Sequence, residues 1–118
     1  MISVTILYPR APGARFDMNY YLHRHMPMSM GLLGSHSGFR GLFVQQGIHG
    51  PDPASAPAFF AITQFLFTSV EAFVDAFLPH AAPLQDDIKR YTDVEPQIVF
   101  GESMLDLRSA ELGSGNPT

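Results

Sequence analysis

Apolar and polar residues alternate along four segments of the chain, and this alternation predicts β-strands. In the first segment, apolar side chains separated by small polar ones stand at Ile2, Val4, Ile6 and Tyr8. The other predicted strands are residues 39–48, 58–67 and 97–104. Glycines interrupt residues 39–48 at two positions, which indicates a bulge or a close approach of another backbone.

Two further segments have the spacing of amphipathic helices. Asp17 precedes the first, residues 18–32, and its side chain suits the N-cap position. In the second, residues 70–78, apolar residues recur at i, i+3, i+4, i+7 and i+8, with Thr68 as the predicted N-cap. Residues 84–91 are expected to form another short helical segment. The order strand, helix, strand, strand, helix, strand predicts a single α+β domain.

The strand at residues 58–67 is apolar on both of its faces. One face carries Phe59, Ala61, Thr63, Phe65 and Phe67, and the other carries Phe60, Ile62, Gln64 and Leu66. A strand of this kind needs cover on both sides. Because two short helices cover only one side of a four-stranded sheet, a second copy of the sheet is expected to cover the other. We therefore expect a homodimer.

Composition narrows the classes of function. The chain has 118 residues, enough for one domain, and 46% of them are hydrophobic. The net charge is −4 and the seven Lys and Arg residues are scattered, so no surface for nucleic acid or an anionic membrane is predicted. The absence of Cys excludes disulfides, thiolate nucleophiles and cysteine-held zinc or iron–sulfur sites.

The two ends of the chain and one charged segment predict the location of the protein, its domain bounds and a solvated surface. The chain opens on a strand pattern without the regions of a signal peptide, and no apolar run approaches the roughly 20 residues of a membrane span. We expect a cytoplasmic protein with one domain, residues 1–106, and a flexible C-terminal tail, residues 107–118. Four charged residues near the end of the second helical region are interpreted as a solvated face: Asp86, Asp87, Lys89 and Arg90.

One histidine lies on the face that the first helix is expected to bury. On a wheel of 100° per residue, that face carries Met18, Tyr21, Leu22, His25, Met28, Ser29 and Leu32. His25 is then either a core histidine, hydrogen-bonded to a neighbouring polar group, or a functional group. His23 is about 200° away on the same helix, so the two imidazoles cannot chelate one metal ion.

Several short motifs resemble the EthD family, named for a protein of ethyl tert-butyl ether degradation. They are Leu7-Tyr8-Pro9, Phe16-Asp17, Tyr20-Tyr21, His25-Met26-Pro27 and Tyr91-Thr92-Asp93. The resemblance covers about residues 1–103 and implies a ferredoxin-like βαββαβ protomer. Its four-stranded antiparallel sheet carries the helices on one face, and two protomers form a dimeric α+β barrel. It also implies small hydrophobic or aromatic substrates in catabolic or polyketide-like pathways.

The first functional hypothesis is an enzyme with His25 as general acid/base. Tyr21 would orient the imidazole or bind a substrate oxygen. The expected substrate-binding residues are Met18, Leu22, Met28, Ser29 and Phe65. We expect no metal and no tightly bound cofactor, because the sequence lacks phosphate-binding and dinucleotide motifs. The reaction would be that of an oxidoreductase, an isomerase or a decarboxylase.

Two other hypotheses use the same cavity. In one, the protein is a non-catalytic accessory that holds a hydrophobic metabolite for a partner monooxygenase, such as a cytochrome P450 system. In the other, His25 is an axial ligand of haem, as in some relatives of the barrel type. Turnover by the protein alone separates the enzyme from the accessory, and a Soret band would indicate haem.

Overall fold

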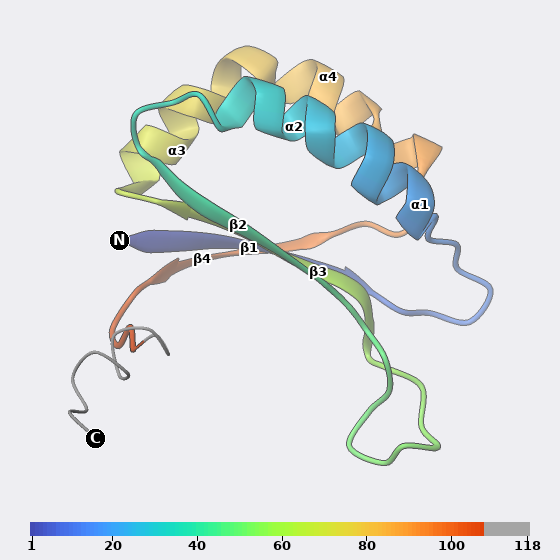
Figure 1. Cartoon of the computed structure of the whole chain (residues 1–118). Coiled ribbons are helices and arrows are strands. Elements are labelled where there is room, and N and C mark those ends of the chain that lie inside the picture. The colour runs from blue at the N-terminus through green and yellow to red at the C-terminus, as the bar shows by residue number, and fades with distance from the viewer. Residues whose placement is uncertain (108–118) are drawn as a thin grey trace.

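A four-stranded antiparallel sheet forms one layer of the protein (Figure 1). The computed structural model describes residues 1–107, so the predicted C-terminal tail lies outside the described residues except for its first position. The strands are β1 (Ile2–Pro9), β2 (Phe39–Gln46), β3 (Phe59–Phe67) and β4 (Gln97–Glu102). Their spatial order is β2-β3-β1-β4, which places β1 and β3 at the centre.

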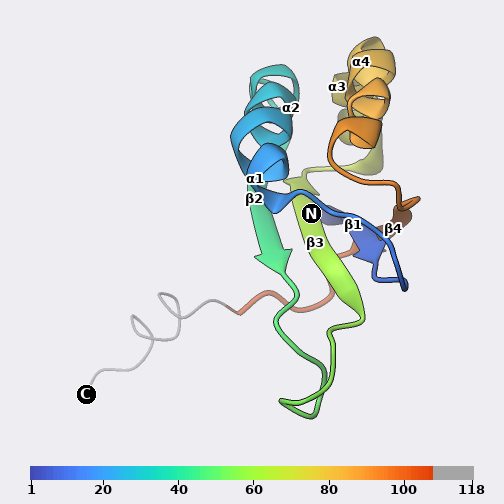
Figure 2. The ribbon, with the colours of Figure 1, turned by 90° about the vertical axis from the view of Figure 1, so that its right-hand side faces the viewer.

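The helices form a second layer on one face of this sheet (Figure 2). The first helical rod contains α1 (Met18–Tyr20), a π-helical turn η1 (Tyr21–His25) and α2 (Met26–Leu33). The second contains α3 (Val70–Phe77), η2 (Leu78–His80), α4 (Ala81–Asp86) and η3 (Ile88–Arg90). The element order confirms the predicted α+β fold of ferredoxin-like topology.

The two helix starts test the predicted caps. Asp17 is the N-cap of α1, since its Oδ1 accepts a hydrogen bond from the Tyr20 amide at 3.0 Å. The N-cap of α3 is Ser69, whose Oγ accepts from the Ala72 amide at 3.0 Å. The prediction of Thr68 was therefore wrong by one residue. The reason is that the Thr68 amide still donates to the carbonyl of Gly38 at 2.9 Å, which prolongs the strand pairing.

The two faces of the sheet differ in what covers them. In β3 and β1 the side chains of Ala61, Thr63, Phe65 and Val4 are at most 3% exposed beneath the helices. Register places the opposite set on the open face: Ser3, Thr5, Leu7, Gly41, Phe43, Gln45, Ile62, Gln64, Leu66, Gln97, Val99 and Gly101. None of these residues is charged, and several are large and apolar.

Candidate functional site

The first helical rod changes its pitch at the π-helical turn η1, Tyr21–His25. The Met26 amide donates to the carbonyl of Tyr21, five residues earlier, so the turn contains one residue more than an α-helical turn. Pro27 follows at once and has no amide hydrogen to restore the regular bonding. The residues that follow are therefore turned relative to their places on a helix of uniform pitch.

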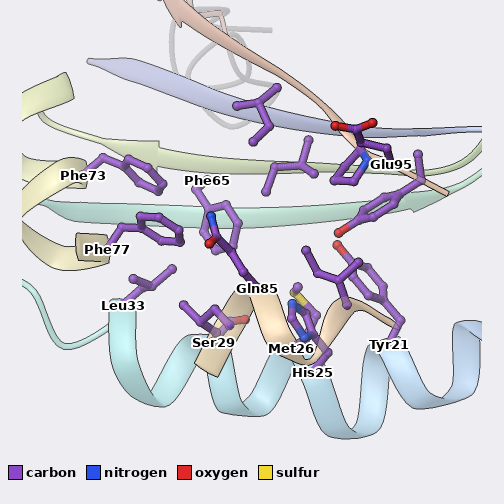
Figure 3. A pocket seen from close by; sticks show the side chains of 16 residues that line it. Tyr21, His25, Met26, Ser29, Leu33, Phe65, Phe73, Phe77, Gln85 and Glu95 are labelled. Carbon is purple, nitrogen blue, oxygen red and sulfur yellow. The ribbon is translucent and has the colours of Figure 1, made fainter. Parts of the chain in front are cut away.

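A cavity of about 320 Å³ lies between the helices and the sheet (Figure 3). Four of the predicted site residues line it: Tyr21, His25, Ser29 and Phe65. Met18, Leu22 and Met28 do not line it, and the placement of Leu22 on the buried face was wrong, since its side chain is 41% exposed. The π-helical turn explains the difference, because it brings Met26 and Leu33 to the cavity instead.

The cavity has an apolar end and a polar end. Phe65, Phe73 and Phe77 gather at one end, and the last two rings are stacked with centroids 5.5 Å apart. His25 and Tyr21 lie toward the other end, where Glu95 also reaches the lining. Within the part of the chain that the structure describes, no Lys or Arg lines this cavity. The cavity is thus mainly apolar, with its titratable groups gathered at one end.

His25 is paired with a carboxylate that sequence reasoning missed. Its Nδ1 lies 2.9 Å from Asp87 Oδ2, and Asp87 Oδ1 accepts from the Tyr20 hydroxyl at 2.8 Å. The Asp87 side chain is only 13% exposed. Its interpretation as part of a solvated face was therefore wrong. The first helical rod covers Asp87, and this contact spans 62 positions in sequence, beyond the reach of any local pattern.

The environment determines the charge of both partners. Burial lowers the pKa of His25, and this effect exceeds the opposing hydrogen bond and charge of Asp87. For Asp87, burial acts to raise the pKa, but hydrogen bonds from His25 and Tyr20 outweigh it and hold the pKa below its usual value. The pair at neutral pH is therefore a neutral imidazole beside a carboxylate.

The pairing with Asp87 determines which ring nitrogen of His25 carries the hydrogen. A carboxylate only accepts hydrogen bonds, so Nδ1 must carry the hydrogen and Nε2 the lone pair. Among residues 1–107, the imidazole of His25 forms one hydrogen bond, the one through Nδ1, so Nε2 has no protein partner. This part of the chain contains no side-chain nitrogen or oxygen that is both fully buried and unpaired, so Nε2 must have some accessible surface. Since His25 is 6% exposed and lines the cavity, Nε2 faces the cavity as a proton acceptor.

Two buried tyrosines, Tyr21 and Tyr91, contact the imidazole. The Tyr21 ring stacks on His25 with centroids 5.6 Å apart and planes 12° apart, while its hydroxyl is paired with Thr63 Oγ1. The hydroxyls of Tyr8 and Tyr91 lie 2.7 Å apart, and burial raises the pKa of both. Asp87, rather than Tyr21, thus orients His25. The burial of Tyr8 could have been predicted from the strand alternation. No local pattern indicated that Tyr91 would contact His25.

Comparison with known proteins agrees with this geometry. Residues 14–95 match the family model described as the EthD domain. The chain belongs to the EthD family. An EthD-like protein from Ralstonia eutropha has 38% identity and a TM-score of 0.83, with coverage of 92% of this chain and 96% of that one. An ethyl tert-butyl ether degradation (EthD) family protein from Bacillus halodurans has 18% identity and a TM-score of 0.62, covering 88% and 99%.

More distant structures share the fold of this EthD protein. SnoaB from Streptomyces nogalater, described as a cofactor-independent oxygenase, has 10% identity and a TM-score of 0.58, covering 88% of this chain and 95% of that one. Among curated proteins there is no match. In residues 1–107, no helix is long and apolar enough to cross a bilayer, and no three His, Asp or Glu side chains are grouped to hold a metal ion.

The first prediction concerns the titration of His25. The folded protein is expected to protonate this imidazole below the ordinary value of 6.5, because burial lowers its pKa. Between the lowered pKa of His25 in the folded protein and the ordinary value of 6.5 in the unfolded chain, the unfolded chain binds more protons. The free energy of unfolding should therefore fall as the pH decreases through this window. An NMR titration measures the pKa, and urea denaturation against pH measures the stability. A folded pKa above 6.5 would contradict the buried, neutral imidazole.

Proposed function

We propose that this EthD protein is a cofactor-independent enzyme that moves a proton on a small hydrophobic or aromatic metabolite, with His25 as general base. The observation that carries the proposal is that His25 lines the cavity while its Nδ1 lies 2.9 Å from Asp87 Oδ2, a pairing that leaves the Nε2 lone pair to the cavity. A neutral imidazole with a pKa below its ordinary value accepts a proton at neutral pH without first losing one.

The Asp87 carboxylate supports the same role after the proton has moved. The imidazolium then faces a negative charge that is itself held by the Tyr20 hydroxyl at 2.8 Å. This arrangement stabilises the charged form when it is needed and keeps the ring in one orientation. Removal of a proton from the ligand leaves an electron-rich anion, the activated form for isomerisation or oxidation. The structurally similar SnoaB, described as a cofactor-independent oxygenase, is consistent with such a reaction.

The test uses 2-tetralone, a neutral aromatic ketone with acidic hydrogens next to its carbonyl. In D₂O the protein is expected to accelerate the exchange of these hydrogens above the rate in buffer, with saturation, as followed by proton NMR. The matched control is His23→Gln, on the same π-helical turn but exposed and outside the cavity lining, which should exchange at the wild-type rate.

The alternative function predicts a different result in the same experiment. An accessory protein that holds a metabolite for a partner monooxygenase would bind 2-tetralone with saturation and leave its exchange rate at the buffer value. That outcome would overturn the enzymatic proposal and assign the cavity to ligand binding alone.

We further propose that two protomers associate through their open sheet faces. The uncharged face with Phe43 at 56% and Val99 at 53% exposure supports this, as does the fold shared with dimeric α+β-barrel proteins. Light scattering is expected to give about twice the chain mass of 13.0 kDa. Ile62→Asp should shift the protein to monomers, because a carboxylate buried without a partner costs several kcal/mol, on the order of 3–5.

The matched control for this dimer prediction is Val70→Asp. Val70 is also apolar and 39% exposed, but it lies on α3, on the other side of the molecule from the open face. Its replacement should leave the mass unchanged. A monomeric wild type, or a dimer that survives Ile62→Asp, would rule out association through this face.

A further inference from the structure

The geometry points to an uncharged aromatic carbonyl compound as the ligand, with its carbonyl oxygen on Ser29 Oγ and its adjacent acidic hydrogen facing His25 Nε2. This inference rests on the proposed function and deepens it, because it names the ligand class and assigns a specific role to Ser29. Three observations carry it: an unpaired hydroxyl, its position relative to His25, and the charges around the cavity.

The first observation is the hydroxyl of Ser29. The residue is only 2% exposed and lines the cavity, yet its side chain forms no hydrogen bond with any residue from 1 to 107. Residues 1–107 contain no side-chain oxygen that is both fully buried and unpaired. Because Ser29 Oγ has no partner, it must have accessible surface, and we place that surface at the cavity that Ser29 lines. A serine in mid-helix usually bonds a backbone carbonyl of the preceding turn or solvent. Here its hydrogen is available to a ligand.

The second observation is the spacing of the two unpaired groups. Residues four apart on a helix lie on the same face, one turn from each other, and Ser29 follows His25 by four. In Figure 3 both side chains reach the same side of the cavity, and the Ser29 oxygen is directed toward the imidazole. Because Nε2 can only accept and the hydroxyl can donate, a ligand that satisfies both presents a hydrogen and an acceptor oxygen close together.

The third observation is electrostatic. Among residues 1–107 the lining includes the exposed Glu95 carboxylate and no Lys or Arg, and Asp87 lies directly behind His25. A carboxylate ligand would meet two negative charges and no cation, so an uncharged ligand is favoured. The rings of Phe65, Phe73 and Phe77 at the far end favour a flat aromatic body.

The proton step that this arrangement supports is balanced within the site. The C–H bond next to the carbonyl breaks, the proton moves to His25 Nε2, and the electron pair is delocalised onto the carbonyl oxygen as an enolate. The Ser29 hydroxyl donates a hydrogen bond to that oxygen, whose negative charge grows as the bond breaks. Return of the proton, or of a deuteron from D₂O, regenerates the ketone.

The experiment compares 2-tetralone with tetralin, which has the same skeleton without the carbonyl. In Ser29→Ala the Kd of 2-tetralone is expected to rise about 2- to 12-fold, as for one neutral hydrogen bond, while that of tetralin stays unchanged. Deuterium exchange should slow by on the order of 10²-fold, as for the loss of one oxyanion donor. Ser29→Thr, which keeps the hydroxyl, should restore both values. Alanine is a good helix former, so the variant is expected to fold.

The outcomes separate this inference from the proposed function. If Ser29→Ala leaves both the Kd and the exchange of 2-tetralone unchanged while wild-type exchange proceeds, the inference is wrong and the proposal for His25 stands. An equal loss for tetralin would also overturn it, because the effect would then be one of packing. Tighter binding of tetralin-2-carboxylate than of 2-tetralone would contradict the uncharged ligand. The protein could also bind 2-tetralone more tightly than tetralin, lose this preference in Ser29→Ala, and yet accelerate no exchange. That result would support the ligand class and overturn the enzymatic proposal.

Discussion

His25→Gln is expected to slow deuterium exchange of 2-tetralone by about 10²- to 10⁴-fold, the usual contribution of a general base. Glutamine has comparable bulk and its amide can still bond Asp87, so the chain should fold. It has no group that accepts a proton near neutral pH. The loss should therefore appear in kcat, with KM for the ketone nearly unchanged, because the apolar end of the cavity is intact.

The same variant distinguishes a functional imidazole from a structural one. If His25 is a core histidine, His25→Gln should lower the free energy of unfolding by about 1–3 kcal/mol and leave activity per folded molecule unchanged. Urea denaturation of His25→Gln and of the exposed control His23→Gln measures this difference. Full activity in a stable His25→Gln protein would contradict both roles.

Asp87→Asn is expected to produce a loss of similar size, about 10²- to 10⁴-fold in kcat, without removing the imidazole. An amide in this place can donate to Nδ1, which moves the ring hydrogen to Nε2 and leaves the cavity facing a donor. The variant also removes the negative charge that stabilises the imidazolium. Nitrogen-15 NMR of the imidazole reports the tautomer, and the exchange assay reports the rate.

Asp86→Asn is the matched control for this variant. Asp86 is the preceding residue, carries the same charge and is exposed outside the cavity lining, so its replacement should leave exchange unchanged. An Asp87→Asn protein with wild-type kcat and an unchanged tautomer would show that the carboxylate does not position His25.

Much of the fold followed from periodicity in the sequence. The alternation in residues 58–67 predicted β3 nearly to the residue, and Thr63 and Phe65, which it placed on one face, are both buried. Local capping chemistry placed the start of α1 at Asp17. These features depend on neighbours within a few positions, and for that reason a single sequence is sufficient to predict them.

The candidate site was only partly predictable. Tyr21, His25 and Ser29 were found because they share a helix face, but Leu22 was misplaced because a wheel assumes one pitch throughout. Asp87 was missed for a different reason. A carboxylate within a charged stretch has the pattern of a solvated residue, and its burial depends on a helix more than sixty positions earlier in the chain.

The extra residue in the turn from Tyr21 to His25 has a consequence for how the cavity can change. The side chains after the turn keep their arrangement relative to one another. Compared with a helix that lacks the extra residue, all of them are rotated about the helix axis by about 100°, the angle of one residue. Deleting one residue within the turn would restore a uniform pitch and would rotate all of the following side chains together relative to the cavity. Point substitutions alter this lining one side chain at a time. A change in chain length at this turn instead alters the lining of an entire wall at once, without altering the sheet beneath it.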